Sequence, residues 1–147
     1  MGWTVLGTLL GALIGALASL AGQQIAARTA DKHERLQRQA DLRLERKDAI
    51  DAFWVAEQEA ERIAEDRGKY DHDTLTKVHS ALWMQYKRLA LICSPELTRP
   101  LENLSLALST VMWDGPPEGV TVSQHIHEPY RLFSAAARNE IEWKEQG

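Results

Sequence analysis

The residues that could support metal chemistry in this chain are its histidines. His125 and His127 stand two residues apart and precede Glu128, while His72 and His79 lie seven residues apart. A zinc site needs three or four converging ligands, and a His-x-His pair directs both rings the same way only in an extended chain. This pair falls in a loop or at a helix start. We therefore predict histidines at surface or capping positions, with no metal and no other cofactor.

The other reactive side chains do not form a catalytic pattern either. Cys93 has no histidine near it in sequence, so we predict a small buried thiol. Glu57, Glu61 and Glu65 share one helix face, but the Glu-x-x-His motif of carboxylate-bridged metal bundles does not occur. We expect this row to be a solvated acidic face. No phosphate-binding glycine loop, nucleophile elbow, CxxC or HExxH motif is present, and we predict a protein that is not an enzyme.

The N-terminal segment is the most informative part of the chain. Residues 2–22 carry no charge, and 21 helical residues at about 1.5 Å each span roughly 31 Å, the thickness of a bilayer's hydrocarbon core. This pattern predicts a transmembrane helix over residues 1–27. A cleaved secretory signal remains the alternative, because residues 16–18 (Ala-Leu-Ala) fit a cleavage site. Against it, the first four residues contain no Lys or Arg, and the apolar run is longer than usual for a signal.

The charges after the span predict its orientation. Residues 28–47 carry a net charge of +3 and residues 48–66 one of −6. Because basic flanks stay in the cytoplasm, we expect the N-terminus outside and a cytoplasmic C-terminal body at the cell membrane. The surface potential decays over about 8–10 Å, so only the first cations can reach lipid headgroups. These are Arg28, Lys32 and Arg35, and Trp3 is expected at the opposite interface.

Small residues recur at every fourth position of the predicted span. Gly7, Gly11, Gly15 and Ser19 form a slowly drifting groove on one helix face. Such a groove lets two helix backbones approach closely, as in GxxxG pairs. It favours helix packing in the membrane, with a homo-oligomer formed through this helix. A groove that faces only lipid remains the alternative.

Helical spacing of apolar residues predicts an all-α fold for the rest of the chain. A basic stalk over 28–48 continues the first helix, either as a loose coiled coil or as a solvated rod. A small antiparallel bundle over 49–147 follows, with helices at about 49–67, 73–93, 95–113 and 124–145. Gly68 is a stop signal, Asp73 a predicted N-cap, and residues 94–96 (Ser-Pro-Glu) a helix start. Residues 115–119 read as a loop, and Pro129 as a residue near the start of the last helix.

The tryptophans are spaced about one per predicted bundle helix, at Trp54, Trp83, Trp113 and Trp143. We expect one core or rim aromatic on each helix, with an exposed aromatic strip for a protein partner as the alternative. The acidic body has no basic face large enough for nucleic acid, so we predict no nucleic-acid binding.

The order of these segments carries a resemblance. An uncharged Met-Gly-Trp start, an Arg-rich stalk, Asp-Ala-Phe at residues 51–53, Cys-Ser-Pro-Glu-Leu at 93–97 and a closing helix with residues 132–140 follow one another. This order resembles a group of small, largely uncharacterised single-pass membrane proteins of high-GC Gram-positive bacteria. The resemblance implies a membrane anchor and a helical body, and it implies no particular activity.

Taken together, the sequence predicts a membrane-anchored helical interaction or scaffold protein without catalytic activity. Its expected partners are the lipid bilayer, a second copy through the transmembrane helix, and a protein that the sequence does not identify. Two other hypotheses stay open. One is a membrane-active effector whose small-residue span oligomerises in the bilayer. The other is an enzyme or metal protein that uses His125, His127 or the acidic face of Glu57, Glu61 and Glu65.

Overall fold

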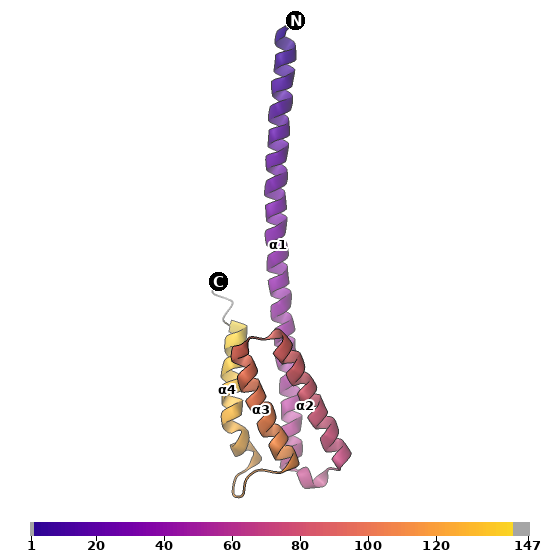
Figure 1. Ribbon diagram of the computed structural model, residues 1–147, viewed down its shortest axis with the longest axis vertical. Coiled ribbons are helices and arrows are strands. Elements are labelled where there is room, and N and C mark those ends of the chain that lie inside the picture. Colours follow the sequence, from indigo (N-terminus) through magenta and orange to yellow (C-terminus); the bar gives the residue numbers. More distant parts are fainter. Residues whose placement is uncertain (1, 143–147) are drawn as a thin grey trace. The chain divides into compact units, whose positions relative to one another are not determined.

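A computed structural model describes the backbone of residues 2–142, together with the side chains of Ser19 and residues 22–142. Within these residues the fold is all-helical and contains no strand, which confirms the predicted fold class at this level. The helices are α1 (Gly2–Glu65), α2 (His72–Ile92), α3 (Pro95–Trp113) and α4 (Val122–Glu142), with a short 3₁₀ turn η1 (Arg67–Lys69) after α1 (Figure 1).

The chain divides into two units, residues 1–42 and residues 43–147. The first unit is the N-terminal part of α1. Residues 22–42, which we call the stalk, expose every side chain to solvent. The second unit contains the end of α1 together with α2, α3 and α4, and we call residues 43–142 the bundle.

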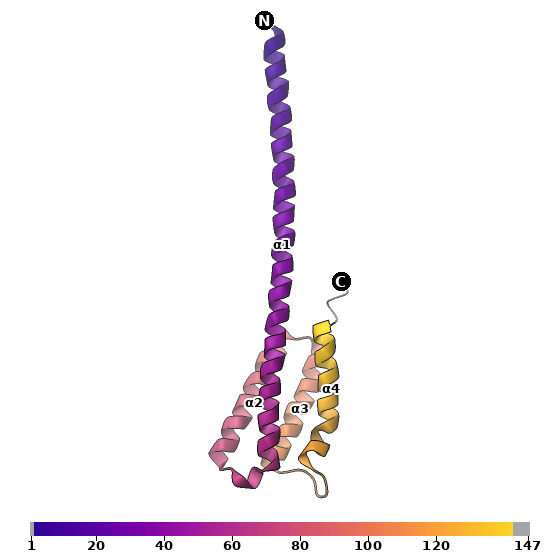
Figure 2. The same ribbon diagram turned by 180° about the vertical axis from the view of Figure 1, so that it is seen from behind.

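Four helical segments alternate in direction within the bundle. Figures 1 and 2 show α3 flanked by α2 and α4, with the last turns of α1 on the opposite side from α3. The α2–α3 junction and the C-terminal end of α4 therefore lie at the same end of the bundle as residue 43 of α1. The segments between consecutive helices are short, as in an up-down-up-down bundle.

The bundle core is built from the apolar stripes of all four segments. Phe53 of α1 and Phe133 of α4 are fully buried and meet edge to face, with ring centroids 5.0 Å apart. The stripe of α3 is buried throughout, and both Val111 and Met112 are in the core. On α4, Phe133 and Ala137 are buried, whereas Tyr130 and Ile141, which continue the same helical spacing, are exposed. The buried core residues are Ala49, Ile50, Phe53, Ala60, Ile63, Ala64, Leu75, Leu82, Leu89, Leu97, Leu101, Leu104, Leu108, Val111, Met112, Val122, Ile126, Phe133 and Ala137.

Two helix starts differ from the sequence predictions. Asp71, not Asp73, is the N-cap of α2, because its carboxylate accepts a hydrogen bond of 2.8 Å from Thr74 N. The last helix begins at Val122 rather than near 124. Thr121 and Gln124 form a reciprocal capping box there, with hydrogen bonds of 3.0 and 3.1 Å. Pro129 consequently lies inside α4.

The loop between α3 and α4 is held to η1, the turn that follows α1. Gly115 and Gly119 both have positive φ, of 83° and 75°. Arg67 donates a hydrogen bond of 2.7 Å to Trp113 O, and a Cβ at position 115 would lie 3.4 Å from the same guanidinium. The turn favours glycine at 115 because other residues rarely adopt this positive φ, whereas the contact with Arg67 leaves room for a Cβ.

Candidate interaction surfaces

Every side chain that the structure describes in the stalk is exposed to solvent. Arg28, Lys32 and Arg35, the predicted headgroup contacts, are all exposed on it. Arg35 donates a hydrogen bond of 3.0 Å to Asp31, one helical turn earlier, and Arg38 pairs in the same way with Glu34. Arg28 and Lys32 therefore have no ion pair of this kind within the described stalk. Trp3, the fourth predicted headgroup residue, lies outside the residues whose side chains are described.

The predicted small-residue groove falls mostly outside the described side chains as well. Gly7, Gly11 and Gly15 belong to the segment whose side chains are not described, and Ser19 is exposed. Within the part of the chain that the structure describes, no helix is long and apolar enough to cross a membrane. Most of the predicted span, residues 1–27, lies outside the side chains that are described.

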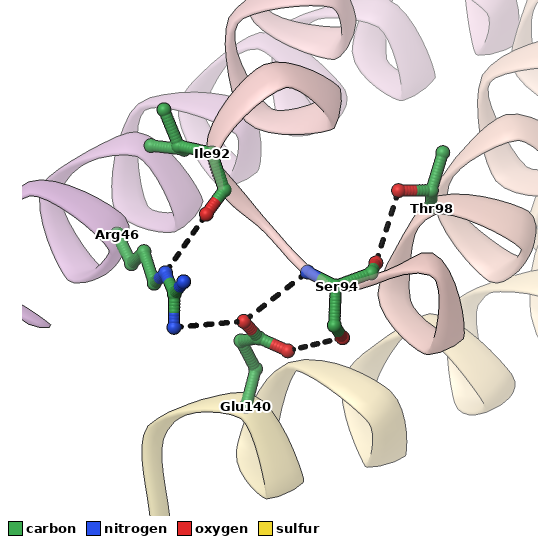
Figure 3. Close-up of polar contacts among 5 residues, drawn as sticks. All are labelled: Arg46, Ile92, Ser94, Thr98 and Glu140. Atoms are coloured by element: carbon green, nitrogen blue, oxygen red, sulfur yellow. Dashed lines mark hydrogen bonds and ion pairs between the residues drawn. The ribbon is translucent and has the colours of Figure 1, made fainter. Parts of the chain in front are cut away.

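A polar cluster within the bundle joins α1, the α2–α3 junction and α4, and we call it the clasp. Arg46 of α1 donates a hydrogen bond of 2.8 Å from Nε to Ile92 O, the last carbonyl of α2, and its guanidinium lies 3.3 Å from a carboxylate oxygen of Glu140 (Figure 3). Glu140 of α4 accepts hydrogen bonds from both the amide and the hydroxyl of Ser94, the N-cap of α3. Thr98 closes the first turn of α3 by donating to Ser94 O at 3.0 Å.

The clasp satisfies helix ends that would otherwise lack partners. A cation at the C-terminus of α2 and a carboxylate at the N-terminus of α3 both match the helix dipoles. Only 9% of the Glu140 side chain is exposed, and its carboxylate is paired with Arg46 and accepts hydrogen bonds from Ser94. The clasp thus fixes the α2–α3 junction to α1 and α4.

Cys93 lies inside this cluster, half-buried between Ile92 and Ser94. Burial and the nearby Glu140 carboxylate raise the pKa of its thiol to about 11, although Arg46 opposes the shift. Because the thiolate is the reactive form, this thiol is a poor nucleophile at neutral pH.

The prediction of a solvated acidic face is wrong for Glu57. The sequence placed Glu57, Glu61 and Glu65 together in solvent, but Glu57 points into the core and is only 1% exposed. Its Oε1 has no hydrogen-bond partner among the described residues. Burial and the neighbouring Glu61 raise its pKa to about 7, so the core holds a carboxyl that is poorly suited to carry a charge. Glu61 is half-buried and Glu65 is exposed.

A histidine–tryptophan group lies at the rim between α2 and α3. Trp83 Nε1 donates to His79 Nε2 at 2.9 Å and to Ser109 Oγ at 3.1 Å. Burial lowers the pKa of His79, which agrees with its role as a neutral acceptor. The His79 ring also meets Trp113, with centroids 5.6 Å apart. Trp54 likewise sits half-buried, against Tyr130 and Phe133. Trp143 lies outside the described residues.

The remaining histidines do not converge. His125 is half-buried, His127 and His72 are exposed, and His72 lies against Trp113 with centroids 5.3 Å apart. Among the residues that the structure describes, no group of three or more His, Cys, Asp or Glu side chains is placed to hold a metal ion.

The sequence analysis did not predict the ion pair between Arg46 and Glu140 or the burial of Glu57. Nothing local marks the first two, since they are joined only by the fold. For Glu57 one signal was available, because it continues the stripe of Ile50 and Phe53 at helical spacing.

No protein-family model, no curated protein and no solved structure matches this chain.

Proposed function

We propose that this chain is a membrane-anchored scaffold in which the N-terminal part of α1 crosses the bilayer and the bundle offers binding surfaces in the cytoplasm. The observation that carries the proposal is the contrast along one helix. Residues 2–22 are uncharged, whereas the next twenty residues are all exposed and hold the ion pairs Arg35–Asp31 and Arg38–Glu34.

The charges support the proposed orientation. Arg28 and Lys32 are the first two cations after the uncharged segment, and both are exposed. Each exposed cation within one Debye length of an anionic cytoplasmic leaflet contributes about 1 kcal/mol of attraction to the membrane surface. Arg35 contributes less to this attraction, because Asp31 already accepts its hydrogen bond.

The bundle supports an interaction role more than a chemical one. Its buried groups serve packing: the clasp joins helix ends, His79 accepts from Trp83, and the Cys93 thiol has a raised pKa. Its surface also carries large exposed apolar side chains, among them Val55, Met84 and Leu91. We take these exposed side chains as candidate contacts for a protein partner.

The test is a crosslinking experiment on the full chain with a C-terminal tag, carried out in cells. The proposal predicts that the membrane fraction yields crosslinked species heavier than the monomer. Replacing Leu10 and Ile14 with Lys should remove both the membrane association and these species, because each charge costs about 3 kcal/mol at a helix centre in the bilayer. A protein that stays strictly monomeric in detergent and captures nothing would contradict a scaffold role.

A further inference from the structure

The four most exposed large apolar side chains of the bundle all lie on α1 or α2. Leu91 is 86% exposed, Val55 69%, Met84 66% and Leu44 61%. The next in order among the described bundle residues, Leu106 of α3, is 48% exposed. Exposed apolar side chains need an explanation only where they gather on one surface, and these four do so.

Helical spacing places the four side chains on two stripes, one on each helix. Both stripes advance by three or four residues at each step, and their members are exposed or half-buried. The α1 stripe consists of Leu44, Asp48, Ala52, Val55, Glu59 and Arg62. The α2 stripe consists of Asp73, Lys77, Ala81, Met84, Arg88 and Leu91.

Both stripes lie on the same side of the bundle. The α1 stripe is centred about 120° around its helix from Trp54, which packs against α4. The α2 stripe is centred about 115° around its helix from Trp83, which bonds to α3. Arg62, the last member of the α1 stripe, donates to the hydroxyl of Tyr70 just before α2 begins. Since α1 and α2 are neighbours (Figures 1 and 2), the two stripes form one outer surface, which we call the α1–α2 face.

The antiparallel packing of α1 and α2 determines which stripe members lie at the same height. Arg46 bonds to Ile92 O near one end of the helix pair, and Arg62 bonds to Tyr70 near the other. Each step forward along α1 is therefore matched by a step back along α2. The pairs at equal height are Leu44 and Leu91, Asp48 and Arg88, Ala52 and Met84, Val55 and Ala81, Glu59 and Lys77, and Arg62 and Asp73.

The two members of every such pair have complementary chemistry. Three of the six pairs are apolar, and each of the other three joins one acid with one base. Within the part of the chain that the structure describes, Asp48 and Arg88 form no ion pair, while Glu59 and Arg62 pair with each other. Both stripes point outward, so the face presents complementary groups side by side to whatever lies on it.

A second copy of the chain matches this face at every height. A two-fold axis parallel to the helices lays α1 of one copy on α2 of the other, and the interface is then isologous. Asp48 meets Arg88 of the second copy, and Val55 meets its Ala81. We propose that the α1–α2 face of the bundle binds the same face of a second copy, with the two-fold axis parallel to the helices.

Other occupants and other orientations fit less well. A uniformly acidic or uniformly basic peptide would meet charges of its own sign on both stripes. A two-fold axis across the helices would stack α2 on its own copy in the opposite direction. With the apolar centres superposed, Lys77 would then lie against Arg88 of the second copy, and these like charges repel. The inference names one partner for the proposed scaffold, and it does not require the membrane anchor.

The first experiment is disulfide crosslinking between two differently tagged full-length copies that are expressed together in cells. Cys93 is replaced by Ser in both; one copy carries Val55→Cys and the other Ala81→Cys. A disulfide requires Cβ atoms about 3.5–4.5 Å apart, so mild oxidation should link the two tags. In the matched control, Ala135→Cys on α4 replaces Ala81→Cys and should give no linked product; both alanines are exposed. Equal linkage at both alanine positions, linkage at neither, or crosslinks only to another protein would overturn the proposal.

Charge reversal tests the pairing without relying on disulfide geometry. Asp48→Arg and Arg88→Asp each place like charges together twice in the dimer, so each should raise its dissociation constant at least about tenfold. The double variant restores opposite charges and should recover most of the affinity, which a misfolded chain cannot do. Arg138→Asp, which reverses an exposed cation on α4, should leave the dimer unchanged. Sedimentation of the purified full chain in detergent measures these constants. A double variant that does not recover refutes the proposed pairing.

The crosslinked samples also separate this proposal from the proposed function. Each is washed with carbonate and divided into membrane and aqueous fractions. Monomer that stays in the membrane pellet refutes the pairing and leaves the anchor standing. Linked dimer that appears in the aqueous fraction refutes the anchor and leaves the pairing standing.

Discussion

The buried carboxyl of Glu57 should make the bundle less stable as the pH rises. The ordinary pKa of a glutamate, 4.5, applies when the chain is unfolded, and the pKa is about 7 in the folded protein. Between these two values the folded state holds a proton that the unfolded state has lost. The free energy of unfolding therefore falls as the pH rises through this interval, and it levels off above pH 7.

The size of the effect follows from the two pKa values. One pKa unit corresponds to about 1.4 kcal/mol, so the rise from 4.5 to about 7 corresponds to roughly 3 kcal/mol of lost stability. Glu57→Gln removes the titrating group and keeps the shape. Its stability relative to the wild type should therefore increase by roughly 3 kcal/mol between pH 4.5 and pH 7.5.

The assay is urea unfolding of the full chain in detergent, followed by the fluorescence of the bundle tryptophans. The difference between variant and wild type at each pH cancels the other titrating groups. Glu59→Gln is the matched control on the same helix. Arg62 lowers the pKa of Glu59, so this variant should shift the pH dependence slightly in the opposite direction. If Glu57→Gln and the wild type show parallel stability over the whole interval, the assignment of Glu57 as a destabilising buried acid is refuted.

Three further predictions follow from the same geometry. Phe53→Ala should cost about 3–5 kcal/mol in the free energy of unfolding, while Val55→Ala, two residues away but 69% exposed, should cost less than about 0.5 kcal/mol. Arg46→Met should lower the free energy of unfolding by about 3 kcal/mol because it leaves Glu140 without its cation, and adding Glu140→Leu should recover part of that loss. A double-mutant cycle of urea unfolding measures both effects. Strict additivity of the two single substitutions would contradict the clasp. Cys93 should react with iodoacetamide about 100-fold more slowly in the folded chain than in urea at pH 7.5, since its pKa is about 11 instead of 9.0; equal rates would contradict its burial.

Local signals in the sequence account for most of the helices. The Ser-Pro-Glu start at residue 94 and the apolar spacing from Leu97 to Met112 predict α3 to the residue. The start of α4 was predicted less well, although its signal was present. Thr121 and Gln124 have the spacing of a capping box, whereas Pro129 drew attention to a later position.

The features that depend on tertiary packing could not be predicted in this way. Arg46 and Glu140 lie 94 positions apart, and only the antiparallel arrangement of α1 and α4 brings them together. Glu57 belongs both to an acidic row and to an apolar stripe, and composition favours the solvated alternative. The packing of α1 on the bundle decides between these two environments and places Glu57 in the core.

The most direct test of the account is whether the intact chain resists extraction from membranes. Cells that express the full chain are lysed, and the membranes are washed with alkaline carbonate, which strips peripheral proteins. The account predicts that the full-length chain stays in the pellet and that the Leu10→Lys, Ile14→Lys variant is released. Full-length wild-type chain in the aqueous fraction, or a shortened chain in the culture medium, would contradict the account.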